Sequence, residues 1–109
     1  EKDKDATEML KKNLFNLSIQ DKSIIIRDEI ENFLDKNSDY IFDIIFFDPP
    51  FLEKDYVNNL RILKKTKLYK KKHIIIIHRE KNSSENLSGI LEILISKEYG
   101  RSKIIFGRF

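Results

Sequence analysis

The chain has 109 residues and a mass of 13.0 kDa, which allows one domain, and 40% of its residues are hydrophobic, enough for one core. Cysteine is absent, which excludes disulfides and thiolate metal sites, and no apolar run approaches the roughly 18–20 residues of a membrane helix. The net charge of +3, from 21 basic and 18 acidic residues, permits nucleic-acid binding without arguing for it. A reducing cytoplasm is the expected location.

The first half of the chain predicts a helix, a short isoleucine-rich strand and a second short helix, over residues 5–17, 23–27 and 30–34. Asp5, with Glu8 three residues later, resembles a capping pair at the start of the first helix. The polar residues 35–39 are typical of a turn and are expected to end the second helix.

The second half predicts a strand, a helix and a strand over residues 42–47, 55–65 and 73–78, then a polar loop over 79–86. Residues 90–99 fit either a helix or a strand by pattern alone. Gly100 breaks this segment, and a final strand returns over residues 103–109. Strands that alternate with helices indicate an α/β fold with a mostly parallel sheet.

The stretch from Phe42 to Phe51 is the most informative part of the sequence. Its apolar run, Phe42–Phe47, indicates a strand buried on both faces, as in a sheet covered by helices on each side. The run stops at Asp48-Pro49-Pro50-Phe51, because proline cannot donate to a ladder. A rigid bend with a carboxylate, backbone carbonyls and a ring is therefore expected at the carboxyl end of a buried strand, where α/β sheets bind ligands.

This arrangement suits the activation of an amine on a nucleobase as a nucleophile. The amine is a poor nucleophile because its lone pair is delocalised into the ring. A carboxylate and a backbone carbonyl that accept its two hydrogens can direct the lone pair toward an electrophile, while an aromatic ring stacks on the extruded base. The alternative is an ordinary turn between a strand and a loop.

Asp48-Pro49-Pro50-Phe51, after such a strand, resembles the catalytic motif of amino-group methyltransferases that use S-adenosylmethionine. The wider pattern resembles the RsmD type, which methylates the N2 amine of a guanine in small-subunit ribosomal RNA. Three further stretches are similar to that family in order: Glu1-Lys2-Asp3, Ile26-Arg27-Asp28, and the closing hairpin Tyr99-Gly100-Arg101-Ser102. The resemblance implies one partial Rossmann-like class I methyltransferase domain over residues 1–109, with residues 90–99 as a strand in a carboxyl-terminal antiparallel hairpin.

The resemblance also implies a cofactor site. Glu1 would accept hydrogen bonds from the ribose hydroxyls, Asp28 would contact the adenine amine, and Glu29 and Asp48 would line the same pocket. From the residues alone, Glu1 could be a frayed terminal acid and Asp28 a helix N-cap. The family's glycine-rich loop has no match, because the three glycines are the late Gly89, Gly100 and Gly107. The first strand, that loop and most of the second strand would precede Glu1, so the isolated chain is expected to be unstable, to need a partner or to be part of a longer protein.

Basic side chains at the same sheet edge are candidates for contacts with ribosomal RNA or the small subunit: Lys54, Arg79, Lys81 and Arg101. The lysine-rich residues 64–72 lie at the opposite edge and are expected to form a solvated loop, and Asp43 is expected to be structural. His78 lies near the ligand edge with an open role, and no second ligand is spaced to form a metal site with it. Two alternatives remain: methylation of an adenine or cytosine amine in DNA or RNA, and a truncated remnant that binds nucleic acid without turnover.

Overall fold

The structure, a computed structural model, describes residues 1–36 and 39–109. It consists of two compact units, Glu1–Lys36 and Asn37–Phe109, which are described separately. The turn expected at residues 35–39 lies partly outside the described residues, and its first two residues belong to a helix instead. None of the helices in the described ranges is long and apolar enough to cross a membrane.

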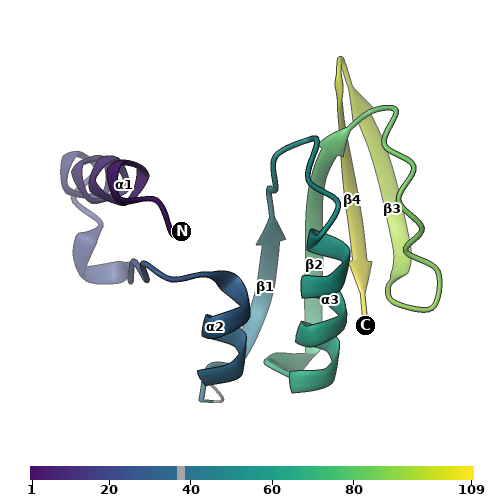
Figure 1. Ribbon diagram of the computed structural model, residues 1–109, viewed down its shortest axis with the longest axis horizontal. Coiled ribbons are helices and arrows are strands. Elements are labelled where there is room, and N and C mark those ends of the chain that lie inside the picture. Colours follow the sequence, from purple (N-terminus) through teal and green to yellow (C-terminus); the bar gives the residue numbers. More distant parts are fainter. Residues whose placement is uncertain (37–38) are drawn as a thin grey trace. The chain divides into compact units, whose positions relative to one another are not determined.

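The first unit contains the two helices that the sequence predicts, α1 (Lys4–Asn16) and α2 (Ile30–Lys36), with a short 3-10 turn between them at Gln20–Lys22 (Figure 1). The expected capping pair at Asp5 is wrong. Asp3 is the N-cap: its backbone is extended, and its Oδ1 accepts a hydrogen bond of 2.7 Å from the Ala6 N–H. Asp5 lies inside the first turn, where its negative charge interacts favourably with the positive end of the helix dipole.

The strand predicted at residues 23–27 does not form. The Glu1 amino group donates to the Ile26 carbonyl at 3.3 Å, and the Asp28 N–H donates to the Glu1 carbonyl at 3.1 Å. This is the bonding pattern of a parallel pair, but in the described part of the first unit it is confined to Glu1. A strand requires a ladder several residues long, so the segment stays irregular and Ile24 is exposed.

The second unit is a mixed sheet with one long helix. In chain order it contains β1 (Phe42–Phe47), α3 (Tyr56–Thr66), β2 (Tyr69–Glu80), β3 (Glu92–Tyr99) and β4 (Ser102–Arg108). The strands lie in the order β1-β2-β4-β3, with β1 and β2 parallel and the other neighbours antiparallel (Figure 1). The predicted α/β fold and its carboxyl-terminal hairpin are therefore confirmed, and residues 92–99 are a strand.

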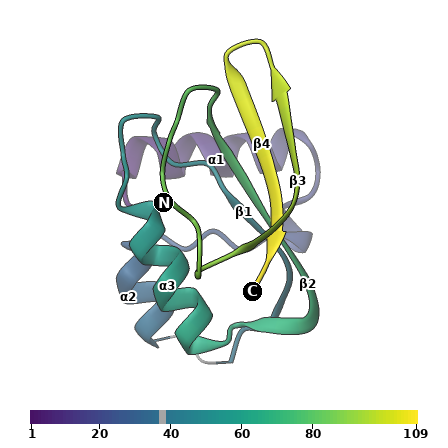
Figure 2. The ribbon, with the colours of Figure 1, turned by 90° about the vertical axis from the view of Figure 1, so that its right-hand side faces the viewer.

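The core of this unit lies between α3 and one face of the sheet (Figure 2). Leu60 and Leu63 of α3 are buried, as are Ile75 and Ile77 of β2. The expectation that β1 is buried on both faces is wrong, because Phe46 is 58% exposed. Strand β1 lies at the edge of the sheet, and in the described part of the second unit no second helix covers the face opposite α3.

Strand β2 is longer than its isoleucine run predicts. It pairs with β1 from Tyr69 onward and with β4 as far as Glu80. Lys70–Lys72 therefore belong to the strand rather than to a loop, and so do Arg79 and Glu80, which were expected to begin the polar loop. Pairing with β1 at the start of β2 and with β4 at its end overrides the local polarity of the two ends.

Candidate active site

The Asp48-Pro49-Pro50-Phe51 turn directly follows β1, as the sequence predicts. Phe47, the last residue of β1, pairs with Ile77 of β2. Asp48, directly after β1, therefore lies beside His78 of β2 at the carboxyl edge of the sheet. The Asp48 side chain is 59% exposed there. A ligand at this edge can therefore reach the carboxylate.

His78 holds the Asp48 carboxylate. Its Nδ1 lies 2.8 Å from Asp48 Oδ1, and its Nε2 lies 2.8 Å from the Ser102 hydroxyl. Because an ionised carboxylate only accepts hydrogen bonds, Nδ1 is the donor, and in a neutral ring Nε2 accepts from Ser102. Three residues, from the end of β1, from β2 and from β4, thus form a chain of hydrogen bonds that fixes one carboxylate oxygen of Asp48.

Phe51 meets the same histidine. Its ring lies edge-to-face against the His78 ring, with centroids 5.4 Å apart and the planes at 75°. Phe51 is 36% exposed, so part of its ring surface is open to a ligand. Sequence reasoning left the role of His78 open. The signal was present, since His78 ends the isoleucine run of a strand predicted to lie in the same parallel sheet as the strand before Asp48.

Arg79 is not available for the phosphate contact expected of it, because its side chain is fully buried. The guanidinium donates to the carbonyls of Pro50, Phe51 and Glu53 and forms an ion pair with Glu85. It also lies over the Tyr56 ring, 4.7 Å from the centroid. In β2 the side chains alternate between faces, so Arg79 points to the α3 side and His78 to the other.

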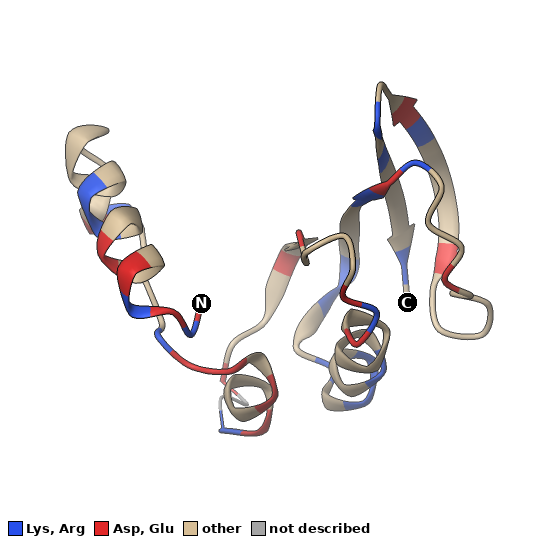
Figure 3. Ribbon diagram, turned by 45° about the horizontal axis from the view of Figure 1, so that its top comes forward, with Lys and Arg blue, Asp and Glu red and all other residues tan. Residues whose placement is uncertain are grey.

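The other basic candidates, Lys54, Lys81 and Arg101, are exposed around this edge. Lys81 pairs with Glu98 at 3.2 Å, and Arg101, whose side chain is 90% exposed, lies 3.9 Å from Glu80. Figure 3 shows charges of both signs near the hairpin tip and in the loop after β1. Exposed ion pairs of this kind contribute little to stability, so these side chains can exchange partners at small cost.

The proposed cofactor residues of the first unit lie next to one another. The backbone bonds described above bring Glu1 beside Asp28. Asp28 Oδ1 accepts from the Glu29 N–H at 2.8 Å and from the Asn32 amide at 3.1 Å, while Glu29 lies 3.8 Å from Lys2. Two carboxylates on adjoining segments are hydrogen-bond acceptors that fit the hydroxyls and the amine of an adenosine.

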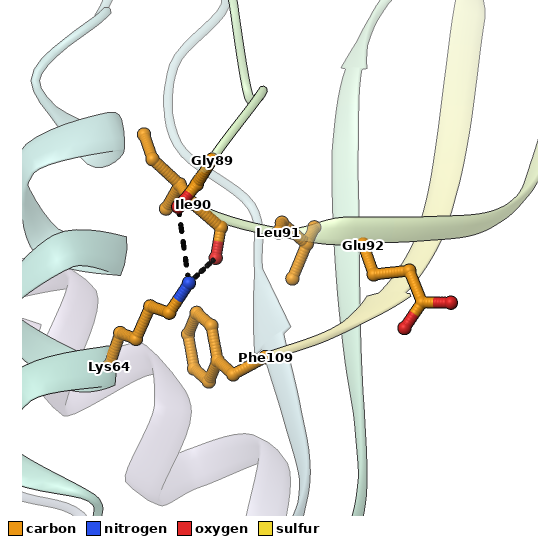
Figure 4. A pocket seen from close by; sticks show the side chains of 6 residues that line it. All are labelled: Lys64, Gly89, Ile90, Leu91, Glu92 and Phe109. Carbon is orange, nitrogen blue, oxygen red and sulfur yellow. Dashed lines mark hydrogen bonds between the residues drawn. The ribbon is translucent and has the colours of Figure 1, made fainter.

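A pocket of about 270 Å³ in the second unit lies away from this edge (Figure 4). Its wall includes Phe109, beyond the end of β4, and Lys64, whose Nζ donates to the carbonyls of Gly89 and Ile90 at 3.1 and 3.0 Å. Because β4 runs antiparallel to β2, the pocket lies at the amino edge. Asp43 also lies there, paired with Lys70 at 2.9 Å, which fits the structural role expected of it.

Residues 1–108 match the model of a family described as Conserved hypothetical protein 95. The chain belongs to this family. It is 36% identical over 73 residues to "Uncharacterized methylase RP545" of Rickettsia prowazekii, an alignment that spans 66% of this chain and 30% of that protein.

Two solved structures share the fold. The Haemophilus influenzae protein described as "putative methylase HI0767" is 25% identical to this chain, with a TM-score of 0.78. The match covers 98% of this chain and 68% of that one. A conserved hypothetical protein of Streptococcus pyogenes is 22% identical with a TM-score of 0.86, over 98% and 67% of the two chains. The fold of this chain is that of part of a Rossmann-like methyltransferase.

Proposed function

We propose that the protein transfers a methyl group from S-adenosylmethionine to the N2 amine of a guanine in small-subunit ribosomal RNA. The observation that carries the proposal is the exposed Asp48 carboxylate, which is held by His78 and followed at once by the Pro49 carbonyl. The family relationship to a named methylase supports methyl transfer, and the resemblance to the RsmD type supports the choice of base.

The residues of the turn have separable roles in this proposal. Asp48 Oδ1 is occupied by the His78 N–H, and the carboxylate has a second oxygen to accept one hydrogen of the amine. The Pro49 carbonyl accepts the other hydrogen. With both hydrogens held, the nitrogen lone pair turns out of conjugation toward the methyl group. The proton that the methylated amine must lose then passes to the Asp48 carboxylate.

Phe51 supplies the stacking surface for the base. Its ring is partly exposed and packs against the His78 ring, which restricts its orientation. Stacking accepts any base, so Phe51 does not select guanine. In this proposal the selection falls to groups that contact the other edges of the base.

The carboxylates of Glu1 and Asp28 would hold the adenosine part of the cofactor. When bound, the cofactor supplies a methyl group whose bond to the sulfonium sulfur breaks as the amine nitrogen bonds the carbon, the sulfur keeping the electron pair. Lys54, Lys81 and Arg101 would contact phosphates of the RNA around the catalytic edge.

The test is the transfer of labelled methyl groups from S-adenosylmethionine, with the chain and with a version extended upstream along its gene. The substrates are small ribosomal subunits assembled from unmodified RNA, the same RNA free of protein, and duplex DNA. The proposal predicts N2-methylguanine in the digested ribosomal RNA. Label on an adenine or cytosine amine would contradict the choice of base, and no label on any substrate would contradict the activity.

A further inference from the structure

Arg79 is a fully buried cation, and the backbone carbonyls that it contacts all belong to one short segment, residues 49–53. Its Nη1 donates to the Pro50 carbonyl at 3.0 Å, and its Nη2 donates to the carbonyls of Phe51 at 2.8 Å and Glu53 at 3.0 Å. A charge that is taken out of water persists only where it is paired and hydrogen-bonded. The loop after Asp48 therefore supplies much of what makes this burial possible.

The loop in turn depends on Arg79 for two of its carbonyls. Pro49 and Pro50 have no N–H group, which removes two local donors from the turn. The Glu53 N–H donates to the Pro50 carbonyl at 2.9 Å, whereas the bonds to the Phe51 and Glu53 carbonyls come from Arg79. Arg79 presents several N–H groups in a rigid plane and reaches successive carbonyls from beneath. Glu85 balances the charge: Arg79 Nε donates to Glu85 Oε1 at 2.9 Å, and Nη2 also contacts that oxygen.

One carbonyl is held differently. Arg79 Nη1 lies 3.4 Å from the Pro49 oxygen, a longer distance than any of those at which Nη1 or Nη2 contacts the three other carbonyls. The Arg79 guanidinium therefore fixes the backbone around Pro49, while its own long hydrogen bond to the Pro49 oxygen is weak. That oxygen can accept a stronger hydrogen bond from a substrate. From the opposite face of β2, His78 fixes the Asp48 carboxylate. Consecutive residues of one strand thus set the two acceptors of the turn.

We propose that Arg79, neutralised by Glu85, is a positioning residue that holds the Pro49 carbonyl in place for the amine of the substrate. The kinetic consequence rests on the proposed methyl transfer, whereas the structural consequence does not. Displacement of an acceptor by about 1 Å can cost on the order of 100-fold in rate, so the effect should appear in kcat rather than in KM.

The experiment compares Arg79→Lys, which keeps the charge and loses the planar fork, with the double variant Arg79→Met/Glu85→Leu, which removes both charges and fills the space. Arg108→Lys, at an exposed ion pair with Glu92 on the opposite edge, is the matched control. Two quantities are measured: hydrogen exchange of the amides of residues 51–55, and kcat and KM for methyl transfer.

For both Arg79 variants we expect exchange in residues 51–55 to accelerate at least tenfold while the amides of β4 keep their protection, and kcat to fall about 100-fold with KM within about threefold. The control should match the wild type. Unchanged exchange in residues 51–55 would overturn the proposal whatever the activity. Wild-type kcat in the double variant would also overturn it. If the wild type itself transfers no methyl group, the proposed function fails and the exchange measurement still decides the role of Arg79.

Discussion

His78 Nδ1 lies 2.8 Å from Asp48 Oδ1, and this bond joins the ends of two parallel strands into one site. It links the residue expected to contact the substrate to β2, which is paired on both sides. It also fixes which carboxylate oxygen faces the protein. The position of the candidate site is therefore set by the sheet itself rather than by the loop alone.

Replacement of His78 tests this bond. His78→Phe removes the donor to Asp48, and we expect kcat to fall roughly 10- to 100-fold, because the carboxylate loses its orientation. His78→Gln keeps an N–H donor and should recover part of that loss. The measurement is steady-state methyl transfer. Equal kcat for the Phe and Gln variants would contradict an orienting role.

Replacement of Phe51 tests stacking. Phe51→Leu should raise KM for the RNA about 10- to 100-fold, because stacking of a base on an aromatic ring contributes roughly 1–3 kcal/mol. Phe51→Tyr keeps the ring and should stay near the wild type. Leu52, which is 96% exposed, provides a neighbouring control through Leu52→Ala. An RNA KM for Phe51→Leu equal to that of the wild type would argue against the stacking role.

The ionisation of Glu85 should make the free energy of unfolding depend on pH. Burial raises the pKa of Glu85, but hydrogen bonds from its own backbone and from Arg79 outweigh burial and hold the pKa below its ordinary value of 4.5. A depressed pKa contributes stability that is complete above 4.5 and is lost as the pH falls through the folded-state pKa.

The measurement is urea unfolding between about pH 7 and pH 3. Glu85→Gln should be less stable than the wild type at pH 7, and the gap between the two should narrow as the pH falls. Glu98→Gln, at an exposed carboxylate, controls for the loss of one negative charge. A gap that stays constant over this range would show that Glu85 does not contribute through its ionisation.

The packing around Gly107 in β4 leaves no room for a larger side chain. A Cβ at this position would lie 2.6 Å from Leu91 Cδ2 and 2.7 Å from the Glu92 carbonyl oxygen. Gly107→Ala should therefore lower the free energy of unfolding by about 1–3 kcal/mol, the usual cost of overpacking. Ser96→Ala, on an exposed position of β3, should change it little. Equal stability of the two variants would mean that the backbone relaxes freely at Gly107.

Sequence reasoning located the turn at Asp48 because an apolar strand that ends in two prolines has few interpretations. It also located α3 by its apolar pattern, whereas residues 90–99 were ambiguous by pattern and were assigned to a strand of the hairpin through the family resemblance. It placed Arg79 in solvent, because a charged residue after an isoleucine run is usually exposed. The burial of Arg79 depends on carbonyls about 30 residues earlier in the chain, which no local pattern reveals.

The errors at residues 23–27 and on β1 have a common physical origin. Pattern indicates which segments can form strands, but a ladder and a covered face depend on neighbours. Residues 23–27 have the composition of a strand and pair only with Glu1 in the described part of the first unit. Phe46 has the character of a core residue and lies on a face that α3 does not cover.

The central claim is that the Asp48 carboxylate directs methyl transfer, and one comparison tests it most directly. Asp48→Ala and Asp43→Ala each remove one exposed carboxylate near β1, but only Asp48 lies at the carboxyl edge of the sheet. Labelled methyl transfer to unmodified small ribosomal subunits should fall at least about 100-fold in Asp48→Ala and stay near the wild-type rate in Asp43→Ala. Equal rates for the two variants would contradict the account.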